Sequence, residues 1–227
     1  MAKSSTASDA PISMLPAEVS ARLFDHARMV HLNPGQTLFL VGDPGDGCYW
    51  VDKGLLKVHV ISRTGSDRIL AILGPGTLAG ELSMFDGAPR SATVCAVRES
   101  KLFFVSRAAF DATLRAQPEI CRYIAALLAR RLRDIDDALA ATSFLPLKGR
   151  AAHAMLALAD AFGKDLGSGR ILIRQKVSQS DVAAMAGMVR ENFSRILQDW
   201  IRRSLVSRLA GYYCLENKAA LERERDL

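Results

Sequence analysis

The pattern of hydrophobic and polar residues divides the chain into a β-rich part and a helical part. Between His31 and about Val105, apolar residues form short runs that end at glycine or proline. Such runs predict β-strands at Thr37–Val41, Cys48–Asp52, Leu55–Ile61 and Arg68–Leu73. Gly54 separates the second run from the third and predicts the end of a strand. Short strands at this spacing are typical of an antiparallel barrel or sandwich.

Helical spacing marks two further segments. Leu15–Val30 carries apolar residues at helical intervals and predicts a short amphipathic helix ahead of the strands. After Pro118, apolar residues follow one helical face over Ile120–Leu139, and neither glycine nor proline occurs before Pro146. A helix of about 25 residues would be about 40 Å long. Its apolar stripe either packs on the barrel of its own chain or pairs with a second copy, and the spacing favours the dimer.

The elements after this helix follow a recognisable order. The pattern predicts a hinge at Phe144–Gly149, a helix over about Gly149–Phe162, a glycine-rich hairpin around Lys164–Arg170, a strand at Ile171–Ile173, two short helices and a final pair of strands within Leu205–Leu215. This is the element order of a winged helix, in which a small hairpin flanks a helix-turn-helix.

The two short helices have the sequence features of a helix-turn-helix. Ser178 and Asp181 resemble a capping box that starts the first helix at Gln179. Gly187 supplies the turn that ends this helix, and a second helix starts near Val189. Apolar residues occupy the positions at which two steeply crossing helices touch: Val182, Ala183, Ala186, Met188, Phe193 and Ile196. This combination predicts helix-turn-helix geometry.

The outward face of the second helix carries Arg190, Glu191, Ser194 and Arg195. An arginine can donate two hydrogen bonds to guanine, and a glutamate can accept one from cytosine. These residues lie near the N-terminal end of the helix, which enters the major groove in this motif. The alternative is a solvated helix face on which Glu191 pairs with Arg195. The turn glycine and the apolar template favour DNA reading.

Composition and charge point to an anionic partner for the C-terminal part. Of the 227 residues, 49% are hydrophobic and 24% are charged, which is a globular composition. The net charge is +6, and residues 144–227 carry 14 basic and 9 acidic side chains, whereas residues 1–143 carry 16 and 15. The excess of positive charge therefore lies in the part that contains the predicted helix-turn-helix.

The same inspection excludes several classes of protein. No run approaches the roughly 18 apolar residues of a membrane span, and residues 1–10 lack the apolar core of a secretory signal. The four cysteines and four histidines lack the spacing of a metal site, and the cysteine spacing suits reduced thiols in the cytoplasm. No nucleophile–base arrangement or P-loop is present, so we expect neither an enzyme nor a membrane partner.

A second group of candidate site residues comprises Gly80, Glu81, Leu82, Arg90 and Ser91. Gly80 allows the backbone to approach a ligand closely, and the segment that follows has the length of one helical turn with free N–H groups. Arg90 is a forked cation suited to phosphate oxygens, and Ser91 offers a hydroxyl donor. Glu81 can accept a hydrogen bond from a sugar hydroxyl. Together these residues predict a pocket for a small anion.

The chain from about residue 15 to about residue 220 resembles the Crp–Fnr family of bacterial transcription regulators. The resemblance is specific at the loop that begins at Gly80 and at the R-E-x-x-x-R motif of Arg190–Arg195. It implies an α+β fold with an antiparallel β-roll sensor domain of the cyclic-nucleotide-binding type at residues 15–117, a long dimerisation helix and hinge at residues 118–145, and a winged helix at residues 146–227. Val189 departs from the family, in which serine or threonine often contacts a phosphate at this position.

The resemblance also implies roles for individual residues. Glu81 would take the ribose 2′-hydroxyl of a cyclic nucleotide, while Arg90 and Ser91 would take its phosphate. Ile135 and Asp136 stand where cyclic-AMP-responsive relatives have threonine and serine that contact the base. An ionised Asp136 only accepts hydrogen bonds, so it can bind adenine or guanine or face water. Cyclic AMP and cyclic GMP therefore both stay open as effectors, and no permanently bound cofactor is expected.

The expected function is that of a homodimeric DNA-binding regulator controlled by a small anionic ligand. The DNA would be an approximate inverted repeat contacted by Ser178, Val189, Arg190, Glu191, Ser194 and Arg195, and RNA polymerase would be a protein partner. Three alternatives stay open. These are a constitutive or redox-tuned regulator that binds no nucleotide and uses Cys95 or Cys121, an enzyme that turns over a bound nucleotide, and an adaptor whose C-terminal domain docks on protein.

Overall fold

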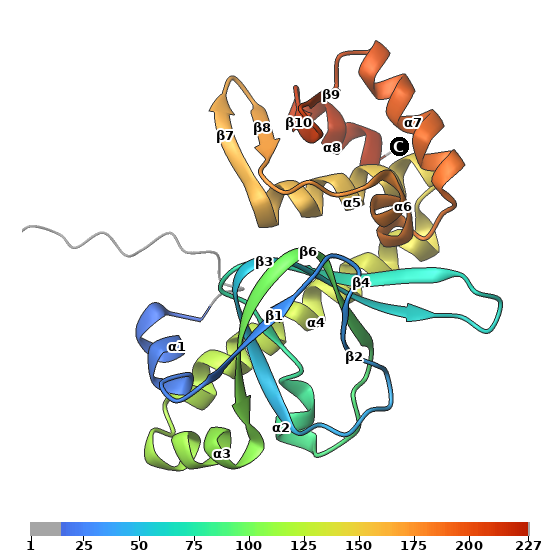
Figure 1. Ribbon diagram of the computed structural model, residues 1–227. Coiled ribbons are helices and arrows are strands. Elements are labelled where there is room, and N and C mark those ends of the chain that lie inside the picture. Colours follow the sequence, from blue (N-terminus) through green and yellow to red (C-terminus); the bar gives the residue numbers. More distant parts are fainter. Residues whose placement is uncertain (1–14, 227) are drawn as a thin grey trace, which may run out of the picture.

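The computed structural model describes residues 15–226 and contains two antiparallel sheets connected by a long helix (Figure 1). The first sheet has six strands in the order β1-β6-β3-β4, with β2 paired to β6 and β5 paired to β3. The elements of this part are α1 (Ala17–Leu23), β1 (Arg28–Leu32), β2 (Thr37–Phe39), β3 (Gly47–Ile61), β4 (Asp67–Leu73), β5 (Leu78–Ala79), α2 (Leu82–Asp86), β6 (Thr93–Ser106) and α3 (Arg107–Ala116). The antiparallel roll confirms the fold class expected for the N-terminal part.

The roll encloses one apolar cluster and carries a second on its helical side. Val51, Leu56 and Leu102 are fully buried inside the sheet because alternate side chains of a strand point to the same face. The second cluster brings Leu23 of α1 and Phe110 of α3 together against the outside of the sheet. The helices α1 and α3 therefore cover one side of the roll, and α2 packs against the same cluster.

α1 is shorter than the helical spacing of Leu15–Val30 predicted. The helix ends at Leu23, and β1 begins at Arg28, which pairs with Phe104 of β6. The prediction was wrong for the second half of this segment because pairing with a neighbouring strand outweighs a local helical spacing.

Gly54 does not end a strand as predicted, because β3 runs through it from Gly47 to Ile61. The register between β3 and β6 shifts on both sides of Gly54, which has φ +103°. A Cβ atom at this position would lie 2.1 Å from Oγ of Ser100. The glycine therefore permits a bulge in a continuous strand, and the roll stays closed at this point.

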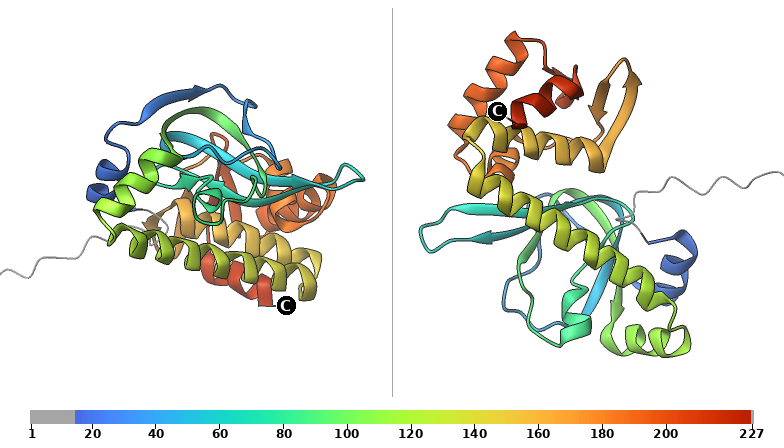
Figure 2. Two further views of the ribbon diagram at one scale, coloured as in Figure 1. Left: turned by 90° about the horizontal axis from the view of Figure 1, so that it is seen from below. Right: turned by 180° about the vertical axis from the view of Figure 1, so that it is seen from behind.

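α4 (Ile120–Phe144) has 25 residues and lies along the back of the roll (Figure 2). Its first turns bury Ile124 against the roll, whereas Leu132, Ile135 and Leu139 are 59%, 49% and 63% exposed. The apolar stripe thus packs on its own roll in one half of the helix and is uncovered in the other. Neither α4 nor any other helix within residues 15–226 is long and apolar enough to cross a membrane.

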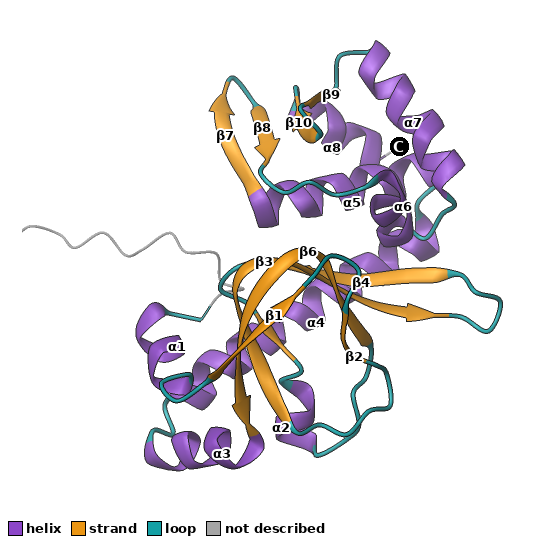
Figure 3. Ribbon diagram, in the orientation of Figure 1, coloured by secondary structure: helices purple, strands orange, loops and turns teal. Residues whose placement is uncertain are grey.

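The second sheet has four strands in the order β7-β8-β10-β9 and lies beside the helices of the C-terminal part (Figure 3). The elements here are α5 (Leu147–Phe162), β7 (Gly163–Gly167), β8 (Arg170–Ile173), α6 (Gln179–Ala186), α7 (Arg190–Arg202), β9 (Val206–Leu209), β10 (Tyr212–Leu215) and α8 (Lys218–Asp226). Phe193, Trp200 and Tyr213 are fully buried in the shared core. The order of elements confirms the expected winged helix.

α8 was not predicted from the sequence, because most of its residues are charged and it offers little apolar periodicity. Leu221 and Glu224 are its buried residues. The helix packs along α5 so closely that a Cβ atom on Gly149 would lie 3.0 Å from the carbonyl oxygen of Arg225. Packing against α5, and not helix propensity, therefore holds α8 in place.

The hairpin of β3 and β4 reaches from the roll to α6 (Figure 1). The ammonium of Lys57 on β3 lies 3.5 Å from Asp67 of β4 and 3.5 Å from Asp181 of α6. Arg68 lies against Gly187, where a Cβ atom would meet its guanidinium. The β3–β4 hairpin of the six-stranded sheet therefore contacts α6 and the turn that follows it directly.

Candidate functional site

The loop between β5 and β6 has the backbone shape expected for a ligand-binding loop. Gly80 has φ +79°, and a Cβ atom there would lie 2.4 Å from Nη1 of Arg90, so only glycine fits. The short helix α2 follows and ends at Gly87, which has φ +69°. Leu82, at the start of α2, is exposed, and Ser91 is exposed on the loop that follows. The structure therefore brings Gly80 and Arg90 into contact and leaves Leu82 and Ser91 at the surface.

Arg90 lies inside the loop and is only 3% exposed. Its guanidinium donates to the carbonyl of Gly80 at 2.8 Å, to the carbonyl of Gly47 at 2.7 Å and to Asp46 at 2.9 Å. The guanidinium carbon lies 4.4 Å from the ring centre of Phe39, a cation–π distance. Within residues 15–226, Nε–H of Arg90 has no acceptor although it is buried. A buried donor without an acceptor costs free energy, so an oxygen acceptor at this N–H would stabilise the loop.

Glu81 is the second buried charge of the loop and is 3% exposed. Its carboxylate accepts a hydrogen bond from Arg131 of α4, and Arg131 also donates to the carbonyl of Leu78 on β5. The loop is therefore tied directly to the long helix. Arg131 was not among the predicted site residues, although it precedes Ile135 by four positions and so lies on the same helical face.

The buried cysteines Cys48 and Cys95 are not activated. Burial, with a smaller effect from the negative charge of Glu81, raises the pKa of the Cys48 thiol. Burial likewise raises the pKa of Cys95, which lies 3.8 Å from a ring nitrogen of His59. Both side chains are therefore protonated thiols at neutral pH, whereas a redox-sensing cysteine needs a lowered pKa.

The two residues expected to contact a base lie on α4 and not in the loop. Ile135 is half exposed and Asp136 is exposed, one turn beyond the Arg131–Glu81 contact. They occupy the uncovered half of the helix, next to Leu132 and Leu139.

The helix-turn-helix forms around the predicted capping and turn residues. Ser178 accepts from the backbone N–H of Asp181 at 3.0 Å and donates to its carboxylate at 2.6 Å. Gly187 ends α6 in the left-handed region at φ +62°. α7 then starts at Arg190, with Val189 as an N-cap whose side chain makes no capping hydrogen bond. These observations confirm the predicted start of α6 and the predicted turn.

The outward face of α7 is free of competing ion pairs. Arg190, Glu191 and Arg195 are exposed, Ser194 is half buried, and Val189 is 60% exposed at the tip of the helix. Across residues 15–226, no ion pair within 4.0 Å involves any of the three charged residues, so the predicted Glu191–Arg195 pair is not formed. Arg195 instead donates a hydrogen bond to the side chain of Asn192 on the same helix, so the three charged side chains stay exposed to solvent.

Family models match both the N-terminal and the C-terminal part of the chain. Residues 29–117 match the cyclic nucleotide-binding domain, and residues 149–224 match the Crp-like helix-turn-helix domain. The chain is 32% identical over 206 residues to the CRP-like cAMP-activated global transcriptional regulator of Mycobacterium tuberculosis, covering 91% of this chain and 88% of that protein. It is 34% identical over 209 residues to the cyclic AMP receptor protein of Thermus thermophilus, covering 92% and 93%. The structure of FixK2 from Bradyrhizobium japonicum shares the fold, with a TM-score of 0.76, 18% identity and coverage of 87% of this chain and 96% of that one.

Proposed function

Because this chain belongs to the Crp–Fnr family of DNA-binding transcription regulators, we propose that it acts as a homodimer whose DNA affinity is controlled by a cyclic nucleotide in the β-roll. Two relatives are named for cyclic AMP, which makes cyclic AMP the first effector to test and cyclic GMP the second. We assign residues 15–117 to sensing, residues 118–145 to dimerisation and residues 146–227 to DNA binding, with no catalytic role.

The observation that carries ligand control is the buried guanidinium of Arg90. It lies against Gly80 with its Nε–H unpaired, and Asp46, which it binds, has a largely exposed side chain. A phosphate that displaces the exposed carboxylate of Asp46 takes over its hydrogen bond from Arg90, and its other oxygens are acceptors suited to the unpaired Nε–H. Ser91, exposed beside Arg90, adds a hydroxyl for the same phosphate.

The pair of Glu81 and Arg131 supplies the connection between ligand and helix. A ribose hydroxyl that donates to Glu81 competes with Arg131 for the same carboxylate, so the ligand changes the restraint on α4. α4 leads through Pro146 into the winged helix, which places the sensor and the recognition helix on one continuous path. Because the coupling is thermodynamic, DNA must tighten ligand binding by the same factor by which ligand tightens DNA binding.

The exposed apolar stripe of α4 supports the dimer. An isologous dimer along α4 covers Leu132, Ile135 and Leu139 of both chains. In this arrangement Ile135 and Asp136 lie between the two subunits, where they can contact a nucleotide base. Two recognition helices spaced by about 34 Å would then meet successive major grooves, and the target would be an approximate inverted repeat.

We assign base reading to Arg190, Glu191 and Arg195, and backbone contacts to Ser178, Ser194 and Val189 near the same surface. Val189 cannot donate a hydrogen bond from its side chain, so its contact is limited to its backbone N–H or to apolar groups. The protein acts on chromosomal DNA in the cytoplasm, with RNA polymerase as the partner that its bound dimer recruits or blocks.

A titration of DNA binding with and without nucleotide tests the proposal. Duplexes selected from a randomised pool are titrated with the protein in the presence of cyclic AMP, cyclic GMP or neither, and nucleotide binding is followed by calorimetry. We expect Arg90→Gln to abolish the heat of nucleotide binding, whereas Arg63→Gln, at an exposed arginine of the β3–β4 turn, retains it. If neither nucleotide produces heat or changes the DNA affinity, the proposed control by a cyclic nucleotide is refuted, whereas the proposed DNA binding is not.

A constitutive regulator is the second candidate, because one observation favours it. Asp46, Gly47 and Gly80 already occupy most donors of Arg90, and Arg131 already neutralises Glu81. In that case the loop is stable without a ligand, and the DNA affinity is independent of both nucleotides. A redox-tuned form using Cys95 is disfavoured by its protonated, buried thiol.

A further inference from the structure

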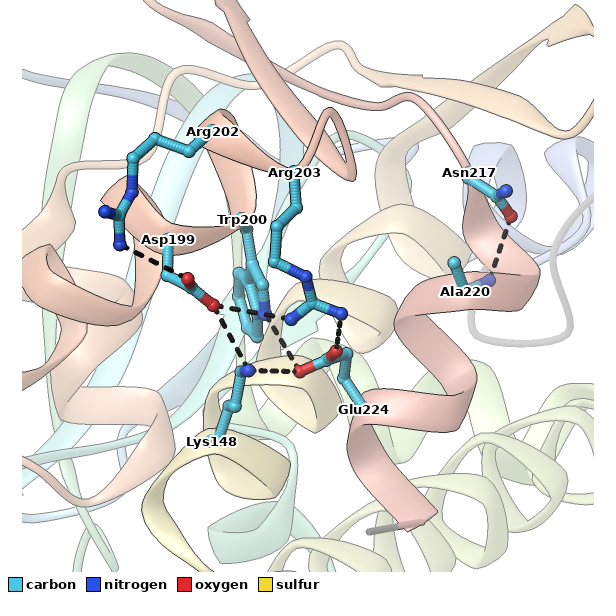
Figure 4. A network of polar contacts seen from close by, with 8 residues as sticks. All are labelled: Lys148, Asp199, Trp200, Arg202, Arg203, Asn217, Ala220 and Glu224. Atoms are coloured by element: carbon cyan, nitrogen blue, oxygen red, sulfur yellow. Dashed lines mark hydrogen bonds and ion pairs between the residues drawn. The ribbon is translucent and has the colours of Figure 1, made fainter.

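A network of charged side chains surrounds the C-terminal end of α7, at the opposite end from the residues assigned to base reading (Figure 4). Glu224 of α8 lies at its centre. Its carboxylate accepts from Lys148 at 2.8 Å, from Arg203 at 2.5 Å and from the indole N–H of Trp200 at 3.3 Å. The three donors belong to the start of α5, the C-cap of α7 and the interior of α7, so one carboxylate joins three helices.

The charge of Glu224 is held in a buried position. The residue is 4% exposed, and an unpaired carboxylate in such a place is costly. Burial on its own would raise the pKa of Glu224, but hydrogen bonds from Arg203, Lys148 and Trp200 hold it below the ordinary value of 4.5. The carboxylate is therefore ionised at neutral pH. Asp199 supports the same cations, at 3.2 Å from Lys148 and 3.4 Å from Arg203.

The network lies where the recognition helix and the hinge meet. Trp200 is fully buried and anchors α7 in the core of the winged helix. Lys148 is the second residue of α5, which begins directly after Pro146, and α4 ends two residues before that proline. Leu221 is fully buried and seats α8 on the same core. Glu224 thus fixes the end of α7 relative to the point at which the sensor half joins the winged helix.

We propose that Glu224 is a positioning residue for DNA reading, which sets the orientation of α7 against α5. The inference rests on the proposed role of α7 in reading bases. Without the carboxylate, Lys148 and Arg203 share Asp199 as their remaining acidic partner, and the N–H of Trp200 loses its charged acceptor. α7 can then tilt about its buried residues. A tilt impairs bidentate contacts to base edges, which depend on geometry, more than it impairs contacts to phosphates.

Glu224→Gln, compared with Glu222→Gln, isolates this effect. Glu222 lies on the same helix and has a partly exposed side chain that is 3.9 Å from Lys218, so its substitution makes the same charge change away from α7. Affinities are measured for the selected duplex and for an unrelated duplex at one salt concentration. We expect E224Q to lower the ratio of specific to non-specific affinity about tenfold, the loss of one impaired bidentate contact, and E222Q to change it less than about twofold.

A spectroscopic measurement separates positioning from general destabilisation. The indole resonance of Trp200, distinguished from that of Trp50 by Trp50→Phe, is followed in ¹H–¹⁵N spectra of the full chain. In E224Q we expect this resonance to shift while the protein stays folded, because the acceptor of the indole N–H changes from a carboxylate to an amide. In E222Q we expect no shift.

The outcomes distinguish this inference from the function on which it rests. A wild-type protein that prefers no duplex refutes the proposed function. A wild-type protein that discriminates, together with a folded E224Q protein that discriminates equally well, overturns the positioning role alone. Should E224Q fail to fold, Arg203→Gln takes its place, since Arg203 is nearly half exposed and its loss removes one arm of the same network. A folded R203Q protein with unchanged discrimination then overturns the inference.

Discussion

The substitution Leu139→Gln tests whether the uncovered half of α4 forms a dimer. Leu139 is 63% exposed in the single chain. Full burial of a leucine contributes about 1.5–3 kcal/mol, so covering the exposed part contributes about 1–2 kcal/mol in each copy. A two-fold axis places Leu139 of both subunits in the interface, and the substitution therefore costs about 2–4 kcal/mol per dimer. This raises the dissociation constant of the dimer roughly 30-fold to several hundredfold.

Sedimentation equilibrium over a range of protein concentrations measures this constant directly. Ile61→Gln is the matched control, because Ile61 is 64% exposed and lies at the end of β3, away from the stripe. The control removes a similar exposed apolar surface and is expected to leave the dimer constant unchanged. Glutamine is a good helix former, so α4 should keep its length, and circular dichroism verifies this. Equal constants for L139Q and the wild type, or equal effects of L139Q and I61Q, would refute the placement of the interface on α4.

Three further predictions concern the other sites. Arg190→Ala should cost about 1–3 kcal/mol of DNA affinity and relax the preference at one base pair, measured by competition among singly substituted duplexes; an equal loss on every sequence would mean that Arg190 touches only phosphate. Arg131→Gln leaves buried Glu81 without its cation and should lower the free energy of unfolding in denaturant by about 3 kcal/mol. The double variant with Glu81→Gln should recover part of that loss, and additive losses would show that the two side chains do not interact. Burial lowers the pKa of His153 from its ordinary value of 6.5. As the pH falls below 6.5, the unfolded chain therefore binds the proton more readily than the folded protein does, and the folded protein loses stability. Melting temperatures should fall less on acidification in His153→Gln than in the wild type, and an equal fall would contradict this assignment.

The parts of the protein that the sequence determined are those whose causes lie within a few residues. Ser178 caps α6 through the N–H of Asp181, three positions away, and Gly187 ends the helix because it adopts a left-handed conformation. The length of α4 follows from an uninterrupted helical pattern bounded by prolines. Such local signals were sufficient to place Arg190 and Arg195, the residues proposed to read bases, on one exposed helical face.

Local signals failed where strand pairing or packing decided the outcome. Arg28 belongs to a strand because it pairs with Phe104 of β6. The spacing of apolar residues around Arg28 does not reveal this pairing. Gly54 looks like a turn in the sequence but is a bulge, because Ser100 on the neighbouring strand leaves no room for a side chain. The hydrophobic pattern did not predict α8, because Leu221 provides almost all of the apolar contact between this helix and the core.

The chemistry of the two sites divides in the same way. The sequence predicted Glu81 and Arg90 as charged groups of a ligand loop, but it did not show that both are buried or which groups neutralise them. Those partners are Arg131 for Glu81 and Asp46 for Arg90, at separations of 50 and 44 residues along the chain. Burial turns each charge into a group that must be paired, and only the three-dimensional fold decides which distant side chain supplies the pair.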